Sequence, residues 1–498
     1  MPSTKPSPGK IANGSTIPPS VRSTNGLTGR EGTVPLYAVF LVSAESSLYD
    51  TEKGIDEMDR RGFLGFASAC LSATAFSLNA KGANDRVVVA IMGINDRGMD
   101  LATEFAKMRD VEVGYLADPD SRLFPDRVKE LHAISGRKPK CVQDFRRALD
   151  DRNVDAVAIA TPDHWHALGA ILACQAGKDV YVEKPTSHNL WEGRRMVEAA
   201  RKYDRVVQVG TQNRSAEYVR AAIEYAHSSA FGDIHFVRVM NSKRREPMAA
   251  RPDADVPEGV DYDMWLGPAP KRRFNENRFH YSWHWFWEYG GGDLSNDGVH
   301  QIDIARWVTG RTYPNAVASS GGTYDLKDDR ETPDTQTVTW DFDGLSIVLE
   351  QTLWTPYMAK TPLELRDKTD AMPNWPFNGT RVEVYGSKQF MCLGRMGDGW
   401  QVYDADGKTL SAQRGRFAAT NTRHAVNFIE CMRSRQRPNA DIEDGHLSTA
   451  LAHYGNIAYR VGRRLRIDPR AEAFIDDADA NNLASRKYRE PWVVPETV

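Results

Sequence analysis

The sequence is poor in cysteine and has no long apolar run. Five cysteines occur among 498 residues, and the four that follow residue 80 are widely spaced, with no Cys-x-x-Cys pair. Neither a zinc site nor a disulfide framework is predicted, and we expect no metal. No apolar run reaches the length of a membrane span, which argues against stable membrane insertion. The net charge of −3 lacks the basic excess of nucleic-acid-binding proteins, so no nucleic-acid partner is expected.

Residues 1–57 have little material for a core. Residues 1–33 are rich in Ser, Pro, Gly and Thr and carry few large apolar side chains. We predict that 1–57 is a disordered or mis-called extension, with Met58 as the true start.

Residues 58–80 have the order of features found in an export signal. Arg60 and Arg61 form a basic region, an apolar run follows, and Ala80 ends a candidate cleavage site. The Arg-Arg-x-Phe-Leu pattern resembles a twin-arginine signal, so an exported, periplasmic protein is expected. The alternative is a disordered leader followed by an amphiphilic helix.

Residues 85–212 have the pattern of a dinucleotide-binding domain. An apolar run of strand length over 86–93 enters the turn Gly93-Ile-Asn-Asp-Arg-Gly98, and a helical pattern follows over 99–108. Strand, glycine-rich turn and helix together form a unit that binds pyrophosphate at the helix N-terminus. Asn95 stands where the second glycine is usual, but Asn tolerates positive φ better than most residues.

The following segments extend this unit. A second strand over 111–117 ends in Asp118, an acidic residue placed to accept hydrogen bonds from the adenosine ribose and to favour NAD. Arg122 offers a partner for a 2′-phosphate, which keeps NADP open. Strand patterns at 155–160, 179–182 and 206–209 alternate with helical patterns at 163–176 and 191–203, which predicts a doubly wound parallel sheet.

Two turns at the carboxyl ends of these strands carry candidate chemistry. Thr161-Pro162-Asp-His-Trp-His166 follows one strand, although its proline also suits an ordinary helix start. Glu183-Lys184-Pro185 follows another. A lysine at the end of a buried run can have a lowered pKa and serve in proton transfer; the alternative is a solvated loop lysine.

Residues 213–480 change to an α+β pattern. Strands are predicted at 233–241, 335–341, 345–352, 380–385 and 400–403, and helices at 218–227, 299–309, 424–434 and 444–465. We expect a large, mostly antiparallel open sheet with one free face. The aromatic-rich stretch 265–289 suits either a core or a carbohydrate site, and the tail 481–498 is expected to wrap over the body.

A glycine-rich turn at 289–292 leads into a helix start with unusual polarity. Asn296, Asp297, His300 and Asp303 lie within about two turns of an otherwise apolar helix. An imidazole beside carboxylates and a carboxamide is suited to moving a proton near neutral pH.

In this order, the glycine turn, the Thr161–His166 turn, Glu183-Lys184-Pro185 and the turn before His300 resemble the Gfo/Idh/MocA family, which includes glucose-fructose oxidoreductase and inositol dehydrogenase. The resemblance covers residues 85–495, and exported twin-arginine members are known in the family. It implies an N-terminal Rossmann domain and a C-terminal domain whose open sheet commonly forms a homo-dimer or homo-tetramer.

The resemblance also implies an activity. NAD or NADP, in a tightly retained form for an exported protein, takes a hydride from a sugar, sugar acid or cyclitol. Lys184 binds the reacting hydroxyl and His300 is the acid/base. Many members have aspartate where this chain has Asn296. As a catalytic residue, Asn296 can orient a substrate hydroxyl but cannot hold a charge, so Asp303, one helical turn on, is expected to orient His300 and raise its basicity instead.

The predicted cofactor-binding residues are Gly93, Asn95, Asp96, Arg97, Gly98, Asp118, Thr161, Pro162, His166, Glu183, Lys184 and Gln212. Two other functions stay open. One is an exported glycoside-cleaving enzyme that uses a retained NAD by transient oxidation. The other is a non-catalytic binding protein that keeps the fold.

Overall fold

The computed structural model describes residues 86–368 and 371–498. The predicted extension 1–57 and the predicted signal at 58–80 lie outside these residues. Within the described part, no helix has both the length and the apolar character needed to cross a bilayer. Its four cysteines are all free.

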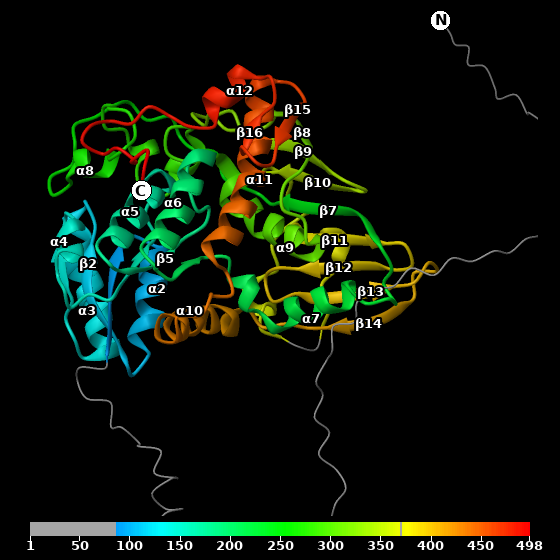
Figure 1. Ribbon diagram of the computed structural model, residues 1–498, viewed down its shortest axis with the longest axis horizontal. Coiled ribbons are helices and arrows are strands. Elements are labelled where there is room, and N and C mark those ends of the chain that lie inside the picture. Colours follow the sequence, from blue (N-terminus) through cyan, green and yellow to red (C-terminus); the bar gives the residue numbers. More distant parts are fainter. Residues whose placement is uncertain (1–85, 369–370) are drawn as a thin grey trace, which may run out of the picture. The chain divides into compact units, whose positions relative to one another are not determined.

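A six-stranded parallel sheet forms the first part of the described chain (Figure 1). Its strands lie in the order β3 (Lys140–Val142), β2 (Val111–Ala117), β1 (Val87–Met92), β4 (Ala156–Ile159), β5 (Asp179–Val182) and β6 (Val207–Val209). Successive strands are added on one side from β1 to β3 and on the other side from β4 to β6. The boundary between β1 and β4 is therefore the topological switch point, where ligands of such sheets bind. The predicted Rossmann sheet is confirmed.

Helices cover both faces of this sheet, as its fully buried strands require. On one face, α5 (Asp163–Gln175) and α6 (Leu190–Lys202) pack against β1, β4 and β5. On the other, α2 (Arg97–Ala106) and α3 (Phe124–Ser135) pack against β1 and β2. A short helix, α4 (Arg146–Leu149), lies between β3 and β4.

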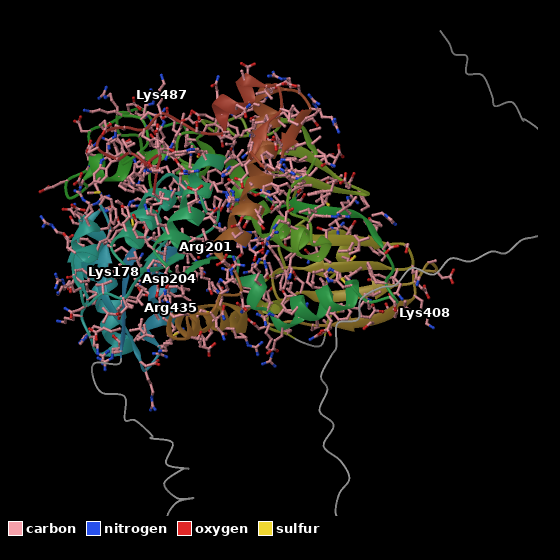
Figure 2. The ribbon with its side chains drawn as sticks, in the orientation of Figure 1. Lys178, Arg201, Asp204, Lys408, Arg435 and Lys487 are labelled. Carbon is pink, nitrogen blue, oxygen red and sulfur yellow. The ribbon has the colours of Figure 1, made fainter. Side chains whose placement is uncertain are left out.

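The layer formed by α2 and α3 is completed by a helix from far along the chain. In α10 (Phe417–Ser434), Phe428 packs on Phe105 of α2 and on Tyr181 of β5, with ring centroids 6.3 and 5.9 Å apart. The end of α10 is fastened to the same sheet, because Arg435 donates to the Asp179 carboxylate at 2.6 Å. Figure 2 shows Arg435 with its neighbour Asp204, whose carbonyl it also contacts.

A ten-stranded sheet forms the second part. Its strands lie in the order β14 (Thr409–Gln413), β13 (Gly399–Tyr403), β12 (Phe390–Gly394), β11 (Arg381–Gly386), β7 (Ile234–Ser242), β10 (Leu345–Thr352), β9 (Thr335–Phe342), β8 (Ala316–Gly322), β15 (Leu465–Asp468) and β16 (Ala473–Phe474). Every neighbouring pair is antiparallel except β7 and β10. The predicted mostly antiparallel sheet is confirmed.

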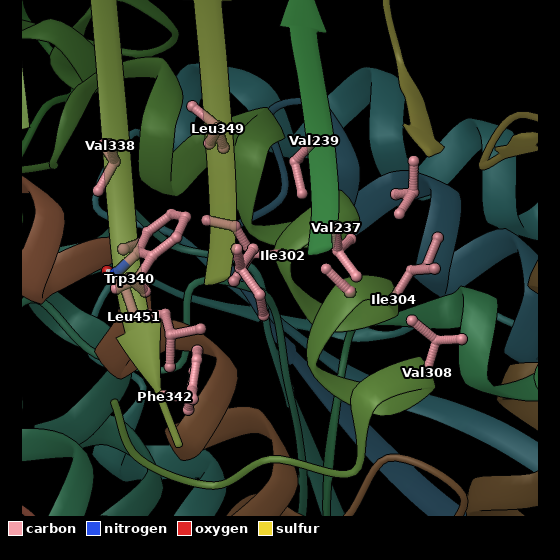
Figure 3. Close-up of a cluster of buried hydrophobic side chains, with 14 of the residues drawn as sticks. Val237, Val239, Ile302, Ile304, Val308, Val338, Trp340, Phe342, Leu349 and Leu451 are labelled. Carbon is pink, nitrogen blue, oxygen red and sulfur yellow. Dashed lines mark hydrogen bonds between the residues drawn. The ribbon is translucent and has the colours of Figure 1, made fainter. Parts of the chain in front are cut away.

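Helices cover one face of this second sheet. They are α7 (Glu217–Ala226), α9 (Val299–Thr309) and α11 (Ile442–Val461). Ile302 and Ile304 of α9 enter a core with Val237 and Trp340, and the Trp340 indole donates to the Leu451 carbonyl at 2.9 Å (Figure 3). Side chains along β10 alternate between buried and half-buried, the pattern of a sheet covered on one side.

Several element boundaries differ from the prediction, and the largest difference is at the helix expected over 424–434, which begins at Phe417. The helix expected over 444–465 ends at Val461, because Gly462 adopts positive φ and Leu465 starts β15. A π-helical turn over Leu294–Gly298 precedes α9, so the helical segment begins before residue 299. π-helical turns often occur at functional sites.

The C-terminal tail crosses the body, as predicted. Arg486 and Tyr488 both donate to the buried Glu192 carboxylate of α6, at 2.9 and 3.0 Å. Trp492 packs on Trp165 of α5, with ring centroids 5.2 Å apart. A further short helix, α12 (Ala478–Leu483), includes the first residues of the tail.

Candidate active site

A cavity of about 400 Å³ lies at the carboxyl ends of the first sheet's central strands. Its walls come from both parts of the described chain. The first part contributes the glycine turn, Asp118 and the turns at Thr161 and Lys184, and the second contributes the loop around Trp283, the helix start with His300, and Arg395. Cavities of this size suit a small ligand or cofactor fragment.

The glycine turn has the geometry of a phosphate cradle. Gly93 has φ +84°, and a Cβ added to it would lie 2.7 Å from the Ala160 carbonyl oxygen. A Cβ on Gly98 would lie 1.7 Å from the Gly93 carbonyl oxygen, so both positions need glycine. The turn opens the N-terminus of α2, and Asn95, Asp96 and Arg97 line the cavity. The residues present fit the pyrophosphate of a dinucleotide.

The acidic residue after β2 is fixed by backbone groups. Asp118 accepts hydrogen bonds from the amides of Ile94 and Asp120, both at 2.9 Å. Burial nevertheless raises the pKa of Asp118 to about 6. It lines the cavity where the adenosine ribose of a bound dinucleotide would lie.

Arg122, the residue expected to be able to bind the 2′-phosphate of NADP, forms an ion pair with Asp120. Its guanidinium forms two hydrogen bonds to the Asp120 carboxylate, at 2.7 and 2.6 Å. His280, from the second part of the chain, contacts the same carboxylate at 3.1 Å. Arg122 is therefore engaged by a carboxylate and does not line the cavity, an arrangement that favours NAD.

Arg97 holds the turn that carries Lys184. Its Nε donates to Glu183 at 2.7 Å, and this ion pair keeps the pKa of Glu183 low although burial opposes it. With its amide oriented to donate to the Gly210 carbonyl, Gln212 also accepts from Arg97 at 3.0 Å. These predicted cofactor-binding side chains thus contact one another as well as lining the cavity.

His166 joins the other two turns. Its Nδ1 lies 2.7 Å from the Pro185 carbonyl, and its Nε2 lies 2.9 Å from the Thr161 carbonyl. The Lys184–Pro185 peptide is cis. Thr161, Pro162 and His166 all line the cavity.

Lys184 spans the cavity to the second part of the chain. Its Nζ donates to the Asn296 backbone carbonyl at 2.8 Å and to the Asn296 side-chain oxygen at 3.0 Å. Burial lowers the pKa of Lys184, while the carboxylates of Glu183, Asp297 and Asp163 act in the opposite direction. An ammonium has three N–H groups, so one stays available for a ligand.

His300 lies on the same wall of the cavity, and its own imidazole ring is neutral. Burial lowers its pKa well below 6.5, and the positive charges of Arg395 and Lys184 lower it further. Nδ1 is buried and has no hydrogen-bond partner among the residues that the structure describes, so Nε2 is the nitrogen that reaches the cavity. A neutral ring can accept a proton from a ligand hydroxyl.

Asp303 does not take the role expected from the sequence. Its carboxylate, which has no exposed surface, binds the Arg214 guanidinium at 2.8–3.0 Å and accepts from Ser448 at 2.6 Å. It neither contacts His300 nor lines the cavity. At i+3 the side chain turns into the core because Arg214, from a distant turn, is buried there and needs a counter-charge. The carboxylate that acts on His300 is Asp297.

A cluster of charged residues behind His300 was missed from the sequence. The Asp297 carboxylate contacts Lys243 at 2.6 Å, Lys360 at 2.5 Å and Arg395 at 2.7 Å. Asp293 shares Lys243 and binds Arg245 at 2.8 Å. The cations come from loops scattered over 243–395, and only the Asp293–Asp297 spacing was visible in the sequence.

The aromatic-rich stretch forms a buried core and also lines the cavity. Trp265, Trp283 and Tyr289 belong to a buried cluster. Trp265 and Trp283 also line the cavity, as do Tyr281 and His284. In the described ranges, no group of three or more His, Cys, Asp or Glu side chains has the arrangement of a metal site.

Two family models match the chain. One, described as the NAD-binding Rossmann fold of the Gfo/Idh/MocA oxidoreductase family, matches residues 87–211. The other, the C-terminal alpha/beta domain of the same family, matches residues 247–353 and 388–494. Together the two models cover more than half of the chain.

Similar proteins include two curated dehydrogenases. The levoglucosan dehydrogenase of Pseudarthrobacter phenanthrenivorans is 28% identical over 206 residues, 41% of this chain and 46% of that protein. The myo-inositol 2-dehydrogenase of Thermotoga maritima is 30% identical over 189 residues, 37% and 54% of the two chains. The chain thus spans about half the length of the curated relatives it matches.

A solved structure of levoglucosan dehydrogenase with NADH and levoglucosan superposes with a TM-score of 0.57 at 19% identity. The match covers 76% of this chain and 99% of that one. At this identity, the likeness shows a shared fold.

Proposed function

The chain belongs to the Gfo/Idh/MocA oxidoreductase family, with that family's NAD-binding Rossmann fold, and on this premise we propose that it oxidises a hydroxyl-bearing carbon of a sugar, sugar acid or cyclitol. One observation carries the proposal. Lys184, Asn296 and His300 line the same cavity as the glycine turn, although they are up to 116 positions apart in the sequence.

The residues have separate tasks in this reaction. The free N–H of Lys184 donates to the substrate hydroxyl oxygen and stabilises negative charge as the oxygen loses its proton. His300 Nε2 accepts that proton, and its low pKa keeps it ready to do so at neutral pH. Asn296 positions Lys184 through two acceptor atoms.

When bound, the dinucleotide supplies a nicotinamide ring that accepts the hydride from the same carbon. The Gly93–Gly98 turn would hold its pyrophosphate, and Asp118 its adenosine ribose. The Asp120–Arg122 pair supports NAD over NADP.

The open face of the ten-stranded sheet supports assembly into a homo-dimer or homo-tetramer. Phe236, Tyr385, Phe390 and Tyr403 form a continuous row of ring contacts there, with centroids 4.9–5.9 Å apart. All four are only partly buried in the single chain. A row of this kind on an uncovered face is typical of a subunit interface. Export to the periplasm by the twin-arginine route is a proposal that rests on residues 58–80 alone.

Turnover with a panel of sugars, aldonic acids and cyclitols tests the activity, with NADH formation followed by absorbance. Wild type should form NADH with at least one compound, whereas His300→Gln and Lys184→Met should each be slower by about 10²–10⁴-fold. The matched controls are His132→Gln and Lys129→Met, two exposed residues of α3, which should keep wild-type rates.

Two results would contradict the proposal. One is NADH formation that survives both cavity substitutions. The other is release of aglycone from a nitrophenyl glycoside panel without net NADH, which identifies the glycoside-cleaving alternative.

A further inference from the structure

We propose that the substrate carries an oxyanion group, a carboxylate or a phosphate ester, which Arg395 and Arg366 bind beside His300. This inference rests on the proposed function and narrows its substrate class. It follows from a surplus of positive charge on one wall of the cavity.

The surplus is seen by pairing the charges around that wall. Six cations lie in or directly behind it: Lys184, Lys243, Arg245, Lys360, Arg366 and Arg395. Asp293 and Asp297 are the acidic groups that pair with members of this set. Glu183 forms an ion pair with Arg97, which is not a member of this set. Asp163 also acts on Lys184, and Asp398 and Asp367 act on Arg366. The six cations still outnumber these five carboxylates, which leaves room for an incoming anion.

The two arginines that line the cavity have unused donors. Within the described chain, Arg395 donates through Nη2 alone, to Asp297 at 2.7 Å. Arg366 donates through Nε alone, to the Thr361 carbonyl at 2.8 Å. The Arg366 guanidinium also lies over the ring of Phe417, 5.6 Å from its centroid. Guanidinium groups with free terminal nitrogens suit the paired oxygens of carboxylate and phosphate.

The pKa values of two neighbouring cations are lowered, as expected beside uncompensated positive charge. Burial, together with the charges of Arg395 and Lys243, lowers the pKa of Lys360 to about 7, although Asp297 opposes this. Burial and the charge of Arg395 also lower the pKa of Arg366. A bound anion would relieve this repulsion, whereas a neutral sugar would not.

Anion binding would also act on the proton acceptor. The charged groups that face His300 are Arg395, Lys184, Lys360 and Asp297, of which three are cations. Among these groups, Arg395 has the largest effect on the His300 pKa. An anion bound to Arg395 offsets that effect and raises the basicity of the His300 ring. A substrate of this class would thereby strengthen the base that deprotonates it.

Paired probes test the inference. Glucose, glucuronate, gluconate and glucose 6-phosphate share most of their hydroxyls and differ in charge. Their binding to the NAD-loaded protein is measured by calorimetry, and NADH formation is followed separately. We expect at least one anionic probe to bind about ten-fold or more tightly than glucose, and higher salt to weaken it. Comparing the affinities of glucuronate and gluconate with that of glucose 6-phosphate shows whether the site prefers a carboxylate or a phosphate ester.

Variants link the preference to the two arginines. Arg395→Gln and Arg366→Gln should each reduce the ratio of anionic-probe affinity to glucose affinity by about ten-fold. Arg366 has one protein hydrogen bond, so this variant remains informative if Arg395→Gln folds poorly. Arg463→Gln, at an exposed pair with Asp477 outside the cavity, is the matched control.

The outcomes separate this inference from the proposed function. Anion-selective, arginine-dependent binding without NADH from any compound would support the oxyanion site and count against the oxidation. NADH formation with neutral sugars that bind as tightly as their anionic partners would overturn the oxyanion site and leave the oxidation in place. If no anionic probe binds more tightly than glucose, the inference is wrong.

Discussion

Lys184 Nζ donates to both oxygens of Asn296, the backbone carbonyl at 2.8 Å and the side-chain amide oxygen at 3.0 Å. The two residues are 112 positions apart: Lys184 lies in the loop after β5, and Asn296 lies in the π-helical turn before α9. The amide nitrogen of Asn296 in turn lies 3.3 Å from the Asp293 carboxylate. Asn296 thus places a neutral acceptor against the ammonium and a donor against the acid.

Asn296→Asp should raise the pKa of Lys184, because a carboxylate beside the ammonium stabilises its charged form against burial. The basic limb of the kcat/KM profile is then expected to move up by about one pH unit or more. Asn296→Ala adds no charge and serves as the control, with no upward movement. A basic limb that stays in place in the Asp variant would show that Lys184 does not govern it.

Gly93→Ala should abolish tight cofactor binding. The new Cβ would meet the Ala160 carbonyl at 2.7 Å in a backbone of φ +84°. We expect the Kd for NADH, measured by fluorescence, to rise at least about ten-fold, which corresponds to roughly 1.4 kcal/mol. Gly136→Ala has a similar φ of +71° but no atom within 4 Å of the new Cβ, so it should keep NADH binding. Equal loss in both variants would point to general destabilisation.

Asp120→Ser should improve the use of NADP. Removing the carboxylate that holds Arg122 frees its guanidinium for a 2′-phosphate. The ratio of kcat/KM for NADP to that for NAD is expected to rise about ten-fold, as one charge-assisted contact allows. Adding Arg122→Gln should cancel the gain, and a gain that persists would assign NADP binding to another residue.

Asp303→Asn should destabilise the protein. It leaves the buried Arg214 guanidinium without its counter-charge, which costs about 3–5 kcal/mol. The change is measured as the free energy of unfolding in urea. Because Asp303 does not contact His300, any remaining folded enzyme should keep its acid limb. A shifted acid limb with normal stability would restore the orienting role first expected of Asp303.

Stability should fall as the pH drops below about 6.5. Burial lowers the pKa of His164 and His284 to about 3 and that of His424 and His453 to about 4, while unfolded imidazoles titrate near 6.5. The unfolded chain therefore binds more protons between those values, and stability rises with pH there. Burial raises the pKa of Asp100, Asp118 and Asp163, which acts in the opposite direction to the lowered pKa values of the four imidazoles. The thermal midpoint from pH 5 to 7.5 gives the measurement, and a midpoint highest at pH 5 would contradict the prediction.

Local patterns were sufficient for most of the fold. The strand at 179–182, the strand at 345–352 and the helix at 299–309 have the predicted bounds, because each has a continuous burial pattern between clear turn residues. Short edge strands such as β3 and β14 are largely exposed and lack such a pattern, so they were missed.

The site was predictable where it depends on turns and not where it depends on distant charges. Gly93, Lys184 and His300, which line one cavity, could be singled out from the sequence because each follows a strand or opens a helix. Asp303 was misassigned since its partner, Arg214, is 89 positions away. Arg395 and Lys360 lie in segments without a local motif, and only folding brings them to Asp297.

The packing of Phe428 on Phe105 and Tyr181 has a consequence for how the protein can be divided. A fragment that ends at residue 212 would leave the α2 side of its sheet without one of its helices, exposing large apolar side chains to water. Conversely, a fragment that starts at residue 213 would carry α10 with its apolar side uncovered. The chain therefore cannot be separated at the point where its sequence pattern changes, and hinge motion between the two sheets is restrained by a helix shared between them.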